Sequence, residues 1–168
     1  LVWLHGGGYF AGSSIEQVCY DGFNLAKDDD VVVVSVNHRL NAFGYLDLSD
    51  FGSKYENSVN VGMADLVEAL RWVRDNIACF GGDPGNVTIF GQSGGGAKVT
   101  SLMNTPAADG LFQKGIVMSG IADGIMCFDD TDSRPLVDAL LKELGIDAAH
   151  IEQLETLPFE TQIGRAHV

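Results

Sequence analysis

The chain has 168 residues and a formal net charge of −13, from 10 Lys and Arg against 23 Asp and Glu. This acidic excess argues against nucleic acid as a partner, because phosphates require a basic face. Hydrophobic residues make up 46% of the chain, which argues against disorder. The longest apolar run, at residues 31–36, is too short to cross a bilayer. We therefore expect one soluble, globular domain without a membrane span.

The first part of the chain predicts two strands and one helix. Residues 1–4 read as a strand that enters a Gly-rich loop, and Ser14 is placed to cap a helix running to about Lys27. The β-branched run at 31–36 is typical of a strand buried on both faces. A long loop is expected over residues 37–59.

A strongly amphipathic helix is predicted next. Apolar residues recur at intervals of three and four, and two glycines at 81 and 82 end the pattern. The residues expected on its buried face are Met63, Leu66, Leu70, Val73 and Ile77.

The remaining elements continue this alternation. Strands are expected at 87–90 and 115–119, with a helix at about 94–104 between them, and further helices at 133–144 and 148–157. Strands that alternate with helices predict an α/β fold, with a mostly parallel sheet and helices on both faces. Active sites of such sheets lie beyond the carboxyl ends of the strands.

One motif at such a strand end indicates nucleophilic catalysis. Residues 91–95 (GQSGG) match G-x-S-x-G between a predicted strand and a predicted helix, the context that the motif requires. A sharp turn there exposes the hydroxyl of Ser93, and the following helix aims its first N–H groups at developing negative charge. Ser93 is therefore the candidate nucleophile.

A second Gly-rich loop follows the first strand. His5 is followed by Gly6, Gly7 and Gly8. In an α/β-hydrolase, the loop at this position supplies a second part of the oxyanion hole. Without Cβ atoms, the backbone N–H groups of such a loop can approach a tetrahedral oxyanion.

A phosphate-binding loop is the competing interpretation of residues 91–98 (GQSGGGAK). That motif requires Lys directly after its last glycine and a hydroxyl residue next. Here Ala97 precedes Lys98, and Val99 occupies the hydroxyl position. We therefore predict no nucleotide, and no other pattern indicates a cofactor.

The three cysteines, Cys19, Cys79 and Cys127, form no C-x-x-C pair and have no His at metal-binding spacing. No metal site is expected. We interpret the three as small buried apolar residues, with pairing outside the chain as the alternative.

Four separated segments resemble the type B carboxylesterase family of α/β-hydrolases, which includes cholinesterases and bacterial para-nitrobenzyl esterases. They are residues 3–9 (WLHGGGY), 36–40 (VNHRL), 60–74 (NVGM…ALRWVR) and 80–96 (FGGDPGNVTIFGQSGGG). The resemblance covers residues 1–120 and weakens from residue 121 on. It implies an α/β-hydrolase fold, present here in incomplete form, and hydrolysis of small-molecule esters through an acyl-serine.

The resemblance also implies residue roles. Ser93 would be the nucleophile, and the N–H groups of Gly7, Gly8 and Gly94 would form the oxyanion hole. The family often has Glu before the nucleophile and Ala after it, where this chain has Gln92 and Gly94. Since Gln92 removes a negative charge beside the serine, we expect a poor preference for cationic esters such as choline esters.

No residue is assigned as the acid or base of the triad, because in this fold both follow the serine on later strands. The later acids and the other His residues are expected at the surface, in a terminal scar or in structural positions: Asp123, Asp129, Asp130, Asp132, His150, His167, His5 and His38.

We therefore expect residues 1–162 to be the N-terminal part of an α/β-hydrolase domain, nearly inactive without the triad acid and His. Residues 163–168 resemble the translation of a sequencing adapter, and we expect a processing scar there. A catalytically inactive cholinesterase-like interaction module is one alternative function. A hydrolase of amides or carbamates is another. Oligomeric state and compartment are left open.

Overall fold

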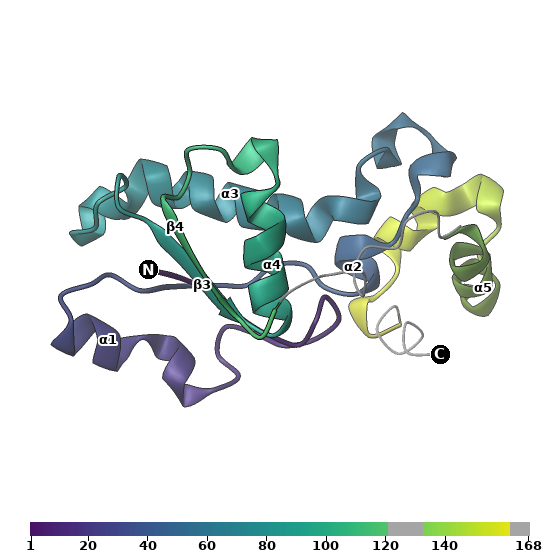
Figure 1. Cartoon of the computed structure of the whole chain (residues 1–168). Coiled ribbons are helices and arrows are strands. Elements are labelled where there is room, and N and C mark those ends of the chain that lie inside the picture. The colour runs from purple at the N-terminus through teal and green to yellow at the C-terminus, as the bar shows by residue number, and fades with distance from the viewer. Residues whose placement is uncertain (121–132, 162–168) are drawn as a thin grey trace.

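The computed structural model describes residues 1–120 and 133–161, and its centre is a parallel sheet of four strands (Figure 1). The strands are β1 (Val2–Leu4), β2 (Val34–Val36), β3 (Thr88–Gln92) and β4 (Lys114–Met118). They lie in the order β2-β1-β3-β4. The register places Leu4 opposite Gly91, so the loops that follow β1 and β3 leave the sheet side by side.

Helices cover both faces of this sheet, as the sequence predicts (Figure 1). On one face, Val2 and Leu4 pack into the main core with residues of α3 (Val61–Asn76) and α4 (Gly94–Met103). On the other face, the ring of Trp3 packs against those of Tyr20 and Phe90, at centroid distances of 4.9 Å. This alternation along β1 is the two-residue period of a strand covered on both sides.

The predicted amphipathic helix is confirmed as α3, which continues as a 3₁₀ helix over Ile77–Phe80. Four of its five predicted apolar positions are buried, and the fifth, Met63, is partly buried against the same core. Gly81 ends the element with a φ of +84°, a conformation that glycine adopts without strain.

The prediction of one helix from Ser14 to Lys27 is wrong. The structure has a 3₁₀ helix at Val18–Asp21 and then the short helix α1 (Phe23–Asp28), separated by Gly22 with a φ of +72°. A Cβ on Gly22 would lie 2.4 Å from the Val33 side chain, so close packing against the chain before β2 interrupts the helix.

The segment around β2 also differs from the prediction. β2 is shorter than the apolar run 31–36, and of that run only Val36 is fully buried. The expected loop 37–59 contains the one-turn helix α2 (Ala42–Tyr45) and three short 3₁₀ helices. Helices of only three or four residues are too short to show a recurring pattern of apolar residues in the sequence.

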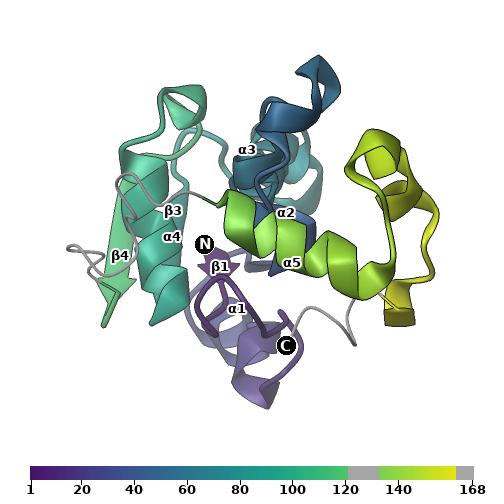
Figure 2. The same cartoon turned by 90° about the vertical axis from the view of Figure 1, so that its right-hand side faces the viewer.

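Beyond residue 132, the structure has α5 (Arg134–Leu144) and a 3₁₀ segment (Ala148–Thr156) that deviates from helical geometry at His150. Figure 2 shows α5 beside α2. α5 and the 3₁₀ segment form a second apolar cluster with residues of the segment after β2. Its buried members are Val137, Leu141, Ile146 and Ile151, and Leu46, Leu48, Phe51 and Tyr55 pack against them.

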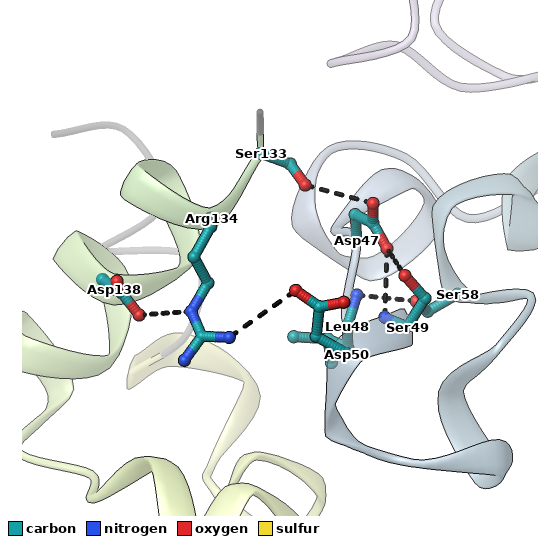
Figure 3. Close-up of polar contacts among 8 residues, drawn as sticks. All are labelled: Asp47, Leu48, Ser49, Asp50, Ser58, Ser133, Arg134 and Asp138. Atoms are coloured by element: carbon teal, nitrogen blue, oxygen red, sulfur yellow. Dashed lines mark hydrogen bonds and ion pairs between the residues drawn. The ribbon is translucent and has the colours of Figure 1, made fainter. Parts of the chain in front are cut away.

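Polar contacts join the start of α5 to the same segment (Figure 3). The Ser133 hydroxyl donates to Oδ2 of Asp47 at 3.1 Å. Arg134 lies 3.6 Å from the carboxylate of Asp50 and 2.8 Å from that of Asp138. The pair with Asp138 lies within α5, and exposed pairs of this kind contribute little stability each.

Candidate active site

Ser93 occupies the turn between β3 and α4, where its backbone has φ +56° and ψ −123°. Positive φ is rare for a residue with a Cβ, and such strain concentrates at functional sites. Hydrogen bonds fix the turn on both sides, because the Ser93 N–H donates to the Met118 carbonyl at 2.8 Å and the Ser93 carbonyl accepts from Ala97 N–H at 3.0 Å. Ser93 is solvent-exposed at the carboxyl end of the sheet.

The two motif glycines leave no space for a side chain. A Cβ on Gly91 would lie 2.4 Å from the carbonyl carbon of Gly95, and one on Gly95 would lie 2.0 Å from the Leu4 oxygen. Since the obstructing atoms are main-chain atoms, no rotamer change can relieve the overlap. The sharp turn at Ser93 therefore depends on glycine at both positions.

The loop after β1 lies directly against this turn. Gly7 and Gly8 have φ values of +86° and +63°. A Cβ on Gly94 would lie 2.4 Å from the nitrogen and Cα of Gly8, so the absence of a side chain at 94 lets the two main chains touch. The structure thus brings together the three residues predicted to form an oxyanion hole. The first N–H groups of α4 have no acceptor within the helix.

The described histidines make no hydrogen bond to the Ser93 hydroxyl. The ring centroids of His5 and His38 lie 4.9 Å apart, and Nδ1 of His5 is 2.8 Å from the Gly6 carbonyl oxygen. Burial lowers the pKa of His38 to about 4, so this ring is neutral at pH 7. His150 is exposed, as predicted. Across residues 1–120 and 133–161, no His or carboxylate hydrogen-bonds to the Ser93 hydroxyl.

Several expectations concern residues outside the described ranges. They are Asp123, Asp129, Asp130, Asp132, Cys127, His167 and the segment 163–168. The expectation of buried cysteines is wrong for Cys19 and Cys79, which are both exposed free thiols. Each lies in a 3₁₀ helix, where short turns leave one side open to solvent.

An ion pair between Arg39 and Asp65 connects the segment after β2 to α3. Asp65 of α3 accepts hydrogen bonds from Arg39 at its backbone N–H (2.9 Å), Nε (2.8 Å) and Nη2 (2.6 Å). Arg39 therefore makes a structural contact between the segment after β2 and α3. The guanidinium holds the pKa of Asp65 below its usual range.

We expect Asp65→Asn to lower the free energy of unfolding by about 1 kcal/mol at pH 7, a modest value because Arg39 is half exposed. Because the folded pKa of Asp65 is depressed, its contribution is complete above the ordinary Asp pKa and is lost as the pH falls through the folded value. The effect measured by thermal unfolding of the complete protein should therefore vanish at strongly acidic pH.

Glu68→Gln is the matched control, since Glu68 lies on the same helix and pairs only with the exposed Arg71 among the described residues. A loss as large as that of Asp65→Asn, or a loss that persists at acidic pH, would contradict a specific role for the Arg39 pair.

Sequence reasoning missed one feature of the site, the burial of Lys98 beside the Gly-rich loop. Its side chain has 0% exposure, and Nζ donates to the carbonyl oxygen of His5 at 3.2 Å. The only local signal is a single Lys among small and apolar residues in α4.

No group of His, Cys, Asp and Glu in the described ranges could hold a metal. None of the helices in these ranges has the length and apolar composition of a membrane span.

A parallel sheet with a strained serine turn after one strand and a glycine loop after its neighbour is the arrangement of an α/β-hydrolase. The model of the carboxylesterase family matches residues 1–159, and the chain belongs to this family.

Individual relatives agree with this assignment. Para-nitrobenzyl esterase of Bacillus subtilis (strain 168) is 44% identical over 160 residues, which are 95% of this chain and 32% of the relative. Carboxylesterase 3B of Mus musculus is 50% identical over 129 residues, covering 77% of this chain and 21% of the relative.

Solved structures give the same result for the fold. An esterase of Clostridium hathewayi, described as hydrolysing aliphatic aromatic polyesters, superposes with a TM-score of 0.91 at 57% identity. The match covers 98% of this chain and 33% of that structure. The fold is therefore that of the α/β-hydrolases, and the matched part of the chain covers between a fifth and a third of the length of these relatives.

Proposed function

We propose that this chain is the nucleophile-bearing part of a serine carboxylesterase that hydrolyses uncharged carboxylic esters through an acyl-serine intermediate. The observation that carries the proposal is the contact between the main chains of Gly8 and Gly94, directly beside the exposed and strained Ser93. A nucleophile and a set of converging N–H donors are the two groups that acyl transfer requires of a site.

In the proposed reaction, Oγ of Ser93 attacks the ester carbonyl and loses its proton to a general base. The carbonyl oxygen becomes an oxyanion and accepts hydrogen bonds from the N–H groups of Gly7, Gly8 and Gly94. Collapse of this intermediate releases the alcohol, which takes up the proton, and leaves the acyl-serine. Water then attacks in the same manner and releases the acid.

The general base and its acid partner are proposed to come from other parts of the protein. Two observations support this: no described His hydrogen-bonds to Ser93, and His5 and His38 lie before the serine, in the wrong order for this fold. The 168-residue chain alone is expected to be nearly inactive, because loss of a triad member costs on the order of 10⁴–10⁶ in rate.

The proposal is tested with the protein expressed from the complete coding sequence. A fluorophosphonate probe should label Ser93, as read by peptide mass spectrometry, and p-nitrophenyl butyrate should be hydrolysed. Absence of both results would favour an inactive interaction module instead. Labelling with faster turnover of a matched anilide or carbamate would assign the same serine to amide or carbamate substrates.

Gln92 gives a prediction about substrate charge. This exposed residue ends β3 immediately before Ser93. Gln92→Glu should raise the ratio of kcat/KM for acetylcholine to kcat/KM for neutral 3,3-dimethylbutyl acetate about fivefold, because a carboxylate near a cationic alcohol group contributes about 1 kcal/mol.

Gln153→Glu adds the same charge at an exposed position of the segment Ala148–Thr156 and should leave the ratio unchanged. A wild-type enzyme that already prefers acetylcholine would refute the role assigned to Gln92.

A further inference from the structure

Lys98 is a completely buried cation without a carboxylate partner. It lies on the second turn of α4, and its side chain has 0% exposure. No ion pair involves it in the described part of the chain, where every carboxylate–cation contact uses an arginine or Lys54. Burial of a charge is costly unless a compensating interaction offsets it.

The compensating contacts of Lys98 are both on the Gly-rich loop. Its Nζ donates to the His5 carbonyl oxygen at 3.2 Å and lies 5.6 Å from the centroid of the Tyr9 ring. His5 and Tyr9 flank the three glycines on either side. A second residue of α4, Ser101, makes a 3.2 Å hydrogen bond with the Tyr9 hydroxyl. The helix that begins at the nucleophile therefore holds both ends of the loop.

Other titratable groups lie around the Lys98 ammonium. Burial lowers the pKa values of His5 and His38, so both rings are neutral at the pH where an esterase acts. Burial raises the pKa of Tyr45. Two carboxylates face these rings: Glu16 lies near His5, and Asp65, whose pKa is lowered by Arg39, lies near His38. Burial lowers the pKa of Lys98 to about 8, so its charge changes at mildly alkaline pH.

We propose that Lys98 is a positioning residue for ester hydrolysis: its buried ammonium fixes the His5 carbonyl and Tyr9, and so holds Gly7 and Gly8 against Gly94. The inference rests on the function proposed above. The positive charge of Lys98 has the same sign as the partial charge at the N-terminal end of α4. Both charges therefore favour negative charge developing on the substrate oxygen. A contact that acts on the transition state lowers kcat when it is removed and leaves KM nearly unchanged.

The test uses Lys98→Met in the full-length enzyme, because Met keeps the length of the side chain without a charge or a donor. We expect kcat for p-nitrophenyl butyrate to fall about 10- to 100-fold, with KM changed less than about threefold. The inhibition constant of a trifluoromethyl ketone, which forms a tetrahedral adduct on the serine, should rise by the same factor as kcat falls.

Val99→Ala is the matched control, since Val99 is also fully buried on α4 but packs into the main core. It should lower Tm and leave kcat within twofold. If Lys98→Met loses no more activity than this control, or if KM rises while kcat holds, the proposal is overturned. Should Lys98→Met not fold, Lys98→Gln takes its place with the same expected fall in kcat.

A measurement on the wild-type enzyme needs no variant. Burial lowers the pKa of Lys98 to about 8, so the ammonium is present below that pH and is lost above it. We expect kcat to fall as the pH rises through about 8, and this alkaline limb should be missing in Lys98→Met. A wild-type kcat that is constant from pH 7 to 10 overturns the proposal.

Failure of the positioning role and failure of the proposed function give different results. If the full-length wild-type enzyme hydrolyses the ester and Ser93 is labelled, the function stands whatever Lys98→Met does. If neither occurs, both proposals fall together.

Discussion

Replacing Ser93 with alanine is expected to lower kcat for p-nitrophenyl butyrate by about 10⁴-fold or more in the full-length protein. The reason is that the acyl-enzyme route disappears, and only the oxyanion donors and substrate binding remain to accelerate attack by water. Labelling by a fluorophosphonate should disappear as well. Tm should not fall, because Ser93 is exposed and its removal leaves no cavity.

Ser53→Ala is the control for this prediction, since Ser53 is exposed in a 3₁₀ helix (Ser53–Tyr55) and belongs to no proposed catalytic group. It should leave kcat within twofold. A Ser93→Ala variant that retains more than about a hundredth of wild-type activity would remove Ser93 from the mechanism.

The second large effect is expected from Gly95→Ala. Its Cβ would lie 2.0 Å from the Leu4 oxygen and 2.9 Å from the His5 oxygen, so the end of β1 must move. Because Gly7 and Gly8 follow that strand end, we expect kcat/KM to fall at least about 100-fold. The free energy of unfolding should fall by about 3 kcal/mol, as in strongly overpacked sites. Chemical denaturation and steady-state kinetics measure the two effects.

Gly85→Ala adds the same methyl group without a main-chain obstruction, since the nearest atom is the flexible Asp83 carboxylate oxygen at 3.2 Å. Its φ is not positive, so alanine is not strained there. Stability and activity should stay close to wild type. If Gly95→Ala affects stability and activity as little as Gly85→Ala, the turn at Ser93 tolerates a side chain at 95.

The turn at Ser93 was predictable from sequence because its requirements are written in five consecutive residues. The sharp turn needs glycine at 91 because a Cβ there would meet the main chain of Gly95. Glycine at 91 and 95 also leaves room for the Leu4 carbonyl, so the local turn and the distant contact select the same residue type. The pattern at 63–77 was predictable for a similar reason. A helix buried on one face repeats its apolar positions at fixed intervals.

Errors arose where distant contacts override local preference. Residues 14–27 have helical periodicity, but Gly22 packs against Val33 and divides the segment. Lys98 shows the same limit for the site. Its partner His5 lies 93 residues away, so nothing near Lys98 in the sequence indicates that its ammonium reaches the loop beside Ser93.

The strand order has a consequence for how the site is assembled during synthesis. β1 pairs with β2 about thirty residues later, but its other neighbour, β3, begins only at Thr88. Contacts this distant along the chain form slowly, because a long loop must close first. The glycine loop leaves the ribosome long before the serine turn it touches. Until β3 has been synthesised, the edge of β1 that pairs with it stays open, and open strand edges are prone to pairing with other chains.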